Sequence, residues 1–174
     1  MKKKETNTDM QKQSAPETIH SKYPETNWLL IYTDGSLLKK NGPAGAGVTC
    51  KLFSFYIALG SNSTDYDGEL EAINTALSQL LHHIHSFQNA VLLCDSLSAF
   101  QSIHQQSATS KRIKDIHQAL KFLSQLDKKI IIQWILSHCR IEGNELADTL
   151  YQKKAHKLNT QQLLRFLFIQ ENSY

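Results

Sequence analysis

The spacing of apolar residues changes along the chain and predicts alternating types of secondary structure. Short apolar or β-branched runs predict five strands, at Trp28–Thr33, twice within Val48–Leu59, at Val91–Cys94 and at Lys129–Leu136. Apolar residues at intervals of three and four predict helices that start at Glu69 and that span Ser96–His104, Ile113–Leu126 and Asn144–His156. The order is therefore three strands, a helix, a strand, helices, a strand and a helix.

Three strands before any helix indicate an antiparallel start to the sheet, and helices between the later strands indicate parallel pairing. Val91–Cys94 is apolar throughout, as expected for a strand that is covered on both faces. We therefore predict an α/β fold in three layers, with a five-stranded mixed sheet and helices on both of its faces. Asp34-Gly35-Ser36 should end the first strand. Asn41-Gly42-Pro43 and the small residues Ala44–Gly47 that follow should mark a turn and close backbone packing.

The length of 174 residues allows one domain with tails. We predict a disordered polar arm over 1–24, a domain over 25–157 and a C-terminal extension over 158–174 with a short helix. Net charge is only +3, and no apolar stretch is long enough to span a membrane. We expect that the N-terminus is not a secretory signal, because no apolar region follows its lysines. We expect an intracellular monomer, nuclear or cytoplasmic. The three cysteines match no zinc motif.

Four acidic residues stand where predicted strands end or helices begin. Asp34 and Asp95 follow two strands, and Glu69 and Asp148 lie early on helices. In a parallel sheet such positions gather at one edge, where four carboxylates would repel one another unless a cation neutralised them. Oxygen ligands without a His or Cys cluster favour Mg²⁺ or Mn²⁺ and metal-assisted phosphodiester hydrolysis.

Three of the four acids, taken alone, also have a simpler interpretation. Asp34 is of the type found in turns, Asp95 is suited to cap the helix that follows it, and Asp148 could be a solvated charge on a helix. Glu69 is different, because it shares a helix stripe with the apolar Ala72 and Ile73. A carboxylate on a buried stripe is costly unless it is paired or bound to a metal.

The motifs around these acids make a family resemblance specific. They occur in ribonuclease H order and spacing, and they are Thr33-Asp34-Gly35-Ser36, Glu69 before Ala72-Ile73, Cys94-Asp95-Ser96 with Ala99, and Ser137-His138 through Gly143-Asn144-Glu145-Leu146-Ala147-Asp148. Over Trp28–Lys157 the chain resembles the ribonuclease H domain carried by non-LTR (LINE/jockey-like) retrotransposons.

The resemblance implies an RNA–DNA hybrid ribonuclease, an endonuclease that cuts the RNA strand with two Mg²⁺ ions, with Mn²⁺ as an alternative. It implies that Asp34 contacts both ions, that Glu69 and Asp95 hold the ion nearer the leaving group, and that Asp148 holds the ion that activates water. It also implies that His138 assists proton transfer or product release.

The resemblance further implies that Gly35, Ser36 and Asn144 contact the hybrid and that a reverse transcriptase is linked to the domain. The chain departs from cellular enzymes in one segment, where Asp65, Tyr66 and Asp67 replace amide side chains. Two acids close to the phosphates of the hybrid should weaken its binding. A dedicated basic substrate-binding segment is missing, and only Lys111, Arg112 and Lys114 could partly replace it.

Two rival classes stay open at this point. One is another nuclease or transferase of the same superfold, such as a transposase, an integrase or a proofreading exonuclease. The other is a catalytically silent fold of the same kind that serves as a nucleic-acid- or protein-binding module. A hybrid-cleavage assay with Mg²⁺ and with EDTA distinguishes the silent module from the enzyme.

Overall fold

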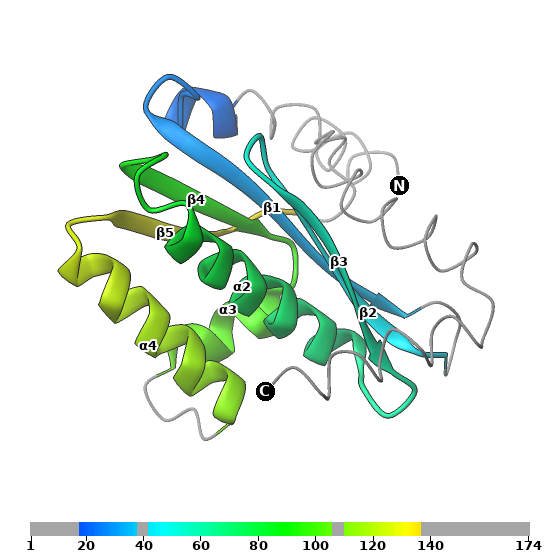
Figure 1. The fold of residues 1–174 in the computed structure, drawn as a ribbon. Coiled ribbons are helices and arrows are strands. Elements are labelled where there is room, and N and C mark those ends of the chain that lie inside the picture. The colour runs from blue at the N-terminus through cyan, green and yellow to red at the C-terminus, as the bar shows by residue number, and fades with distance from the viewer. Residues whose placement is uncertain (1–17, 38–41, 106–109, 137–174) are drawn as a thin grey trace, which may run out of the picture.

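A computed structural model describes residues 18–37, 42–105 and 110–136 of the chain. They form one five-stranded sheet in the order β3-β2-β1-β4-β5 (Figure 1). The neighbours β1–β2 and β2–β3 are antiparallel, and β1–β4 and β4–β5 are parallel. The predicted mixed α/β sheet is therefore confirmed.

The strands and helices follow the predicted order. The strands are β1 (Trp28–Leu37), β2 (Ala44–Thr49), β3 (Ser54–Gly60), β4 (Asn89–Cys94) and β5 (Lys129–Trp134). The helices are α2 (Asp65–His82), α3 (Leu97–His104) and α4 (Lys111–Gln125). The helix predicted over 144–156 and the extension over 158–174 lie outside the described residues.

The side chains of the central strands alternate between two apolar layers, as the two-residue period of a strand requires. Leu29 and Ile31 of β1 and Leu92 of β4 face the main core with α2, α3 and α4. The intervening Leu30 and Val91 face a smaller cluster on the other side of the sheet. The apolar run in β4 is thus explained by burial on both faces.

The first strand is longer than the sequence indicated. Asp34 does not end β1, because Asp34 pairs with Gly47 and the antiparallel ladder continues to Leu37. The small residues over 44–47 are part of β2 rather than of a turn, so the turn prediction is wrong for them, whereas the predicted close backbone packing is confirmed. Their small side chains leave room for α2, whose backbone comes within contact distance of this part of the sheet.

Residues 18–22 form a helical turn beside the second face of the sheet (Figure 1). Ile19 and Tyr23 are only 8% and 3% exposed, and they pack with Leu30, Val91 and the rest of the smaller cluster. The Tyr23 hydroxyl also donates to Gln133 Oε1 at 3.1 Å. The prediction of a disordered arm over 1–24 is therefore wrong for residues 18–24, since two apolar side chains suffice to dock this segment.

No helix in the described part of the chain is long and apolar enough to cross a membrane.

Replacing Tyr23 with Ala should destabilise the domain by about 2–4 kcal/mol, because it removes a buried ring that packs edge-on against Trp28. Urea unfolding would measure the change. Ser21→Ala alters an exposed neighbour on the same turn and should change the unfolding free energy by less than ~0.5 kcal/mol. Equal small effects of both substitutions would show that residues 18–23 do not belong to the folded unit.

Candidate metal centre

Two of the predicted acids lie at the point where the parallel ladder between β1 and β4 ends. The β1–β4 ladder ends with the pair Thr33–Cys94, so Asp34 and Asp95 each follow directly after it. Asp34 is still held on its other side by β2, whereas Asp95 leaves the sheet toward α3. The Trp134 indole N–H, at the end of β5, donates to the Asp95 carbonyl at 3.1 Å and fixes the backbone there.

Glu69 reaches the same edge because the first turns of α2 lie directly on the sheet. A Cβ atom on Gly35 would clash with the backbone of Gly68 and Glu69, and one on Gly68 would come to 2.5 Å from the Gly45 oxygen. Backbone therefore meets backbone at these glycines. The contact places Glu69 of the helix beside the strand, and a larger side chain at either glycine would hold helix and strand apart.

Asp34, Glu69 and Asp95 each offer a carboxylate oxygen, and these three atoms lie within 4.8 Å of one another. Asp34 and Glu69 are 9% and 6% exposed. The Gly35 backbone N–H donates to the Glu69 carboxylate. The Cys94 thiol lies 3.8 Å from Glu69 Oε2 and is itself fully buried.

The electrostatics of this cluster are unfavourable without a cation. Burial, and then the nearby charges of Asp95 and Asp34, raise the pKa of Glu69 to about 9, against the lowering effect of the Gly35 hydrogen bond. Burial, and then the charge of Glu69, raise the pKa of Cys94, so its thiol stays protonated at neutral pH. The charged donors are thus hard carboxylate oxygens, which fit Mg²⁺ or Mn²⁺.

The other site residues predicted from sequence divide into two groups. Gly35 and Ser36 are described, but the Gly35 N–H is engaged by Glu69, and the buried Ser36 hydroxyl has no hydrogen-bond partner among the described residues. Asp148, His138 and Asn144 lie outside the described residues. The simpler interpretation of Asp95 as a helix cap does not hold, because Ser96 is the N-cap and accepts from the Ala99 N–H.

Three residues that support the site were not singled out for it from the sequence. Gly68 sets the approach of α2, Cys94 contacts Glu69, and Trp134 holds the backbone of Asp95. A glycine inside a helical pattern was the one available signal, because such a glycine costs about 1 kcal/mol relative to alanine and calls for a packing reason.

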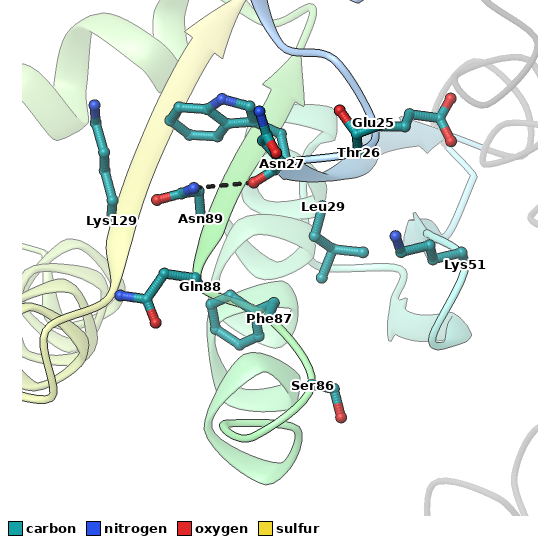
Figure 2. Close-up of a pocket in the computed structure, with 11 residues that line it drawn as sticks. Glu25, Thr26, Asn27, Leu29, Lys51, Ser86, Phe87, Gln88, Asn89 and Lys129 are labelled. Atoms are coloured by element: carbon teal, nitrogen blue, oxygen red, sulfur yellow. Dashed lines mark hydrogen bonds between the residues drawn. The ribbon is translucent and has the colours of Figure 1, made fainter.

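A separate hollow of about 500 Å³ lies at the opposite ends of the parallel strands (Figure 2). Trp28, Asn89 and Lys129, the first residues of β1, β4 and β5, line it. Two contacts lie within its lining: the Asn89 amide donates to the Asn27 carbonyl, and the Lys129 ammonium lies over the Trp28 ring. Glu25 is the one acidic residue in its lining, so no carboxylate cluster forms there.

The RNase H family model matches residues 26–156, which is more than half of the chain. The protein therefore belongs to the RNase H family, and the parallel β1-β4-β5 strands with their connecting helices have the arrangement of that fold. Among curated proteins, no sequence matches the chain.

Replacing Gly35 with Ala should destabilise the domain by about 3 kcal/mol or more, because the new methyl group would force α2 away from β1. Urea unfolding and Mg²⁺ titration by calorimetry would measure the loss of stability and of metal binding together. Ser36→Ala is the matched control on the next residue of β1, since it removes a buried hydroxyl that has no described partner. If Gly35→Ala kept both properties, the helix–sheet contact would not determine the geometry of the site.

The raised pKa of Glu69 predicts a specific pH dependence. The folded pKa of about 9 lies above the ordinary value of 4.5, so Glu69 favours folding below pH 4.5 and this stability is lost as pH rises toward 9. In EDTA, Glu69→Gln should therefore gain stability over the native chain with rising pH, by about 1–3 kcal/mol at pH 8. Urea unfolding at pH 5, 7 and 8.5 measures this gain.

The exposed Glu25→Gln substitution serves as the control for that experiment and should show no comparable gain. Addition of Mg²⁺ should stabilise the native chain more than Glu69→Gln, because the cation neutralises the carboxylates that otherwise repel each other. A constant difference between Glu69→Gln and the native chain from pH 5 to 8.5 would contradict the interpretation.

Proposed function

We propose that this protein is an RNA–DNA hybrid ribonuclease that cuts the RNA strand by metal-dependent phosphodiester hydrolysis. The observation that carries the proposal is the cluster of three carboxylates at the end of the parallel β1–β4 ladder in a chain of the RNase H family. A buried acidic cluster with a raised pKa is costly to folding, and such a cost is typical of a functional site.

In this proposal Asp34, Glu69 and Asp95 hold divalent cations, and Asp148 supplies a fourth carboxylate. Two Mg²⁺ ions, when bound, would activate a water molecule and stabilise the leaving oxygen of the RNA strand. The chain's own contribution is orientation. The Gly35 N–H holds the Glu69 carboxylate, pairing with β2 holds the backbone of Asp34, and the Trp134 indole holds the carbonyl of Asp95.

Recognition of the hybrid would rest on the shape of the duplex, its phosphates and the 2′-hydroxyl groups. We propose Ser36 and Asn144 as substrate contacts, with the neighbouring backbone of Gly35, and His138 as the residue that assists proton transfer or product release. The buried Ser36 hydroxyl, which has no described partner, is consistent with a polar group that a ligand completes. An origin in a non-LTR retrotransposon, a link to a reverse transcriptase and an intracellular location belong to the same proposal.

The purified protein should cleave the RNA strand of a labelled hybrid in Mg²⁺ and should stop when EDTA is added. Asp34→Asn, Glu69→Gln and Asp95→Asn should each lower the rate by about a hundredfold or more, because each removes a charged metal ligand. Asp115→Asn on α4 removes one carboxylate elsewhere and should retain the native rate. Gel separation of the labelled products measures all five proteins.

Two results would point elsewhere. Hybrid binding without cleavage by the native chain, and equal binding by Asp34→Asn, would favour a silent nucleic-acid-binding module. Equal cleavage of single-stranded RNA or of duplex DNA would contradict selectivity for the hybrid.

A further inference from the structure

Helix α4 begins with an unusual concentration of positive charge. Its first turn contains Lys111, Arg112 and Lys114 and no acidic residue, although the N-terminus of a helix disfavours cations. Lys111 and Lys114 are exposed, whereas Arg112 is partly buried against α2. The position of Arg112 therefore needs a compensating interaction.

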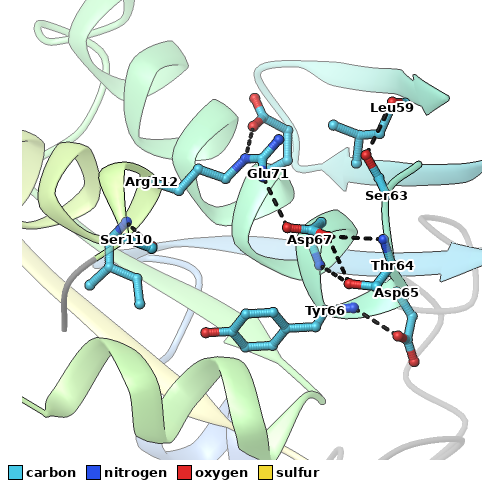
Figure 3. A network of polar contacts seen from close by, with 10 residues as sticks. Leu59, Ser63, Thr64, Asp65, Tyr66, Asp67, Glu71, Ser110 and Arg112 are labelled. Carbon is cyan, nitrogen blue, oxygen red and sulfur yellow. Dashed lines mark hydrogen bonds and ion pairs between the residues drawn. The ribbon is translucent and has the colours of Figure 1, made fainter. Parts of the chain in front are cut away.

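Two carboxylates of α2 provide that interaction (Figure 3). Arg112 Nη1 lies 3.0 Å from Asp67 Oδ1, and Arg112 Nε lies 2.9 Å from Glu71 Oε2. The side chains of Arg112, Asp67 and Glu71 are 35%, 31% and 22% exposed, so all three are partly withdrawn from solvent. One guanidinium thus bridges two acids that stand one helical turn apart.

Asp67 is fixed by a second set of contacts at the start of α2. Its Oδ2 accepts from the Thr64 backbone N–H at 2.9 Å, and the Thr64 hydroxyl accepts from the Asp67 N–H. The carboxylate cannot swing away from its place on the helix without losing the cap.

Asp67 and Glu71 lie two residues before and two residues after Glu69, the helix residue of the carboxylate cluster. Two residues correspond to a rise of only about 3 Å but to nearly opposite faces of a helix, so these charges lie beside the cluster at a separation on the order of the screening length of ~8 Å at physiological salt. A nucleic-acid strand that brings a phosphate to the cluster would therefore meet the charges of both acids. Unpaired, they would repel it.

We propose that Arg112 is a substrate-affinity determinant: by pairing with Asp67 and Glu71 it offsets the negative charge beside Glu69 and so permits a polyanionic strand to approach the metal-binding carboxylates. The inference rests on the proposed nuclease function. It modifies the expectation that acids in this segment simply weaken binding, because Asp67 is bound to a cation of the same chain.

Binding of a fluorescent RNA–DNA hybrid by anisotropy tests the proposal, with all variants built on Asp34→Asn in Mg²⁺ so that the hybrid stays intact. Arg112→Gln should weaken binding about threefold to tenfold at ~50 mM salt, and the difference should shrink at ~300 mM salt. The combined change Asp67→Asn, Glu71→Gln and Arg112→Gln should restore the affinity, because it removes the exposed negative charge together with the cation.

Lys121→Gln is the matched control, since it removes one positive charge from an exposed position of the same helix. It should weaken binding less than Arg112→Gln does. Equal effects of the two substitutions would overturn the proposal, and so would a triple variant that binds as weakly as Arg112→Gln alone. If Arg112→Gln weakened binding through a general loss of structure, the two further substitutions in the triple variant would not restore the affinity.

If Arg112→Gln fails to fold by circular dichroism, Asp67→Asn with Glu71→Gln in the presence of Arg112 gives the decisive result. That double variant should bind the hybrid at least as tightly as its Asp34→Asn parent, and weaker binding would overturn the proposal. Failure of the nuclease proposal is recognised separately, by an absence of cleavage in the native chain while the Asp34→Asn series still binds.

Discussion

The backbone contact between α2 and the strands β1 and β2 determines how the rest of the site is built. No side chains separate helix and sheet at Gly35, Gly45 and Gly68. The backbone of the first turns of α2 therefore lies directly on the sheet, without a layer of side chains in between. That approach buries Glu69 and brings its carboxylate to the N–H of Gly35. Asp34, the residue before Gly35, is then within reach of Glu69.

The same contact creates an electrostatic cost on the inner side of α2. Glu69 is withdrawn from water among like charges, and its pKa rises to about 9. Chemistry that uses a hard cation would offset this cost, since the cation converts repulsion into attraction. On the outer side of α2 the acids are neutralised within the chain, because Asp67 and Glu71 both form ion pairs with Arg112 of α4. Of the four acidic residues of α2, Asp67 and Glu71 are thus paired with Arg112, whereas Glu69 lies among like charges.

Much of the fold followed from periodicity, because strands and helices bury their apolar residues at characteristic intervals. The strand over 91–94 and the stripe of α2 are clear cases, both buried as predicted. The prediction was wrong where a local signal competes with a neighbouring strand. Asp34-Gly35-Ser36 has the composition of a turn, yet β2 pairs with all three residues and keeps them extended.

The sequence by itself determined which residues could form a site: acids after two strands, and an acid on the apolar stripe of a helix. It also determined the order of the elements and hence the class of the fold. Only the tertiary structure decided the distances, because these depend on side-chain volumes contributed by segments far apart in the chain. The approach of Gly68 to Gly45, the bridge from Arg112 to Asp67, and the docking of Ile19 and Tyr23 on the sheet are contacts of this kind. No local pattern specifies them, since each partner alone is compatible with an exposed position.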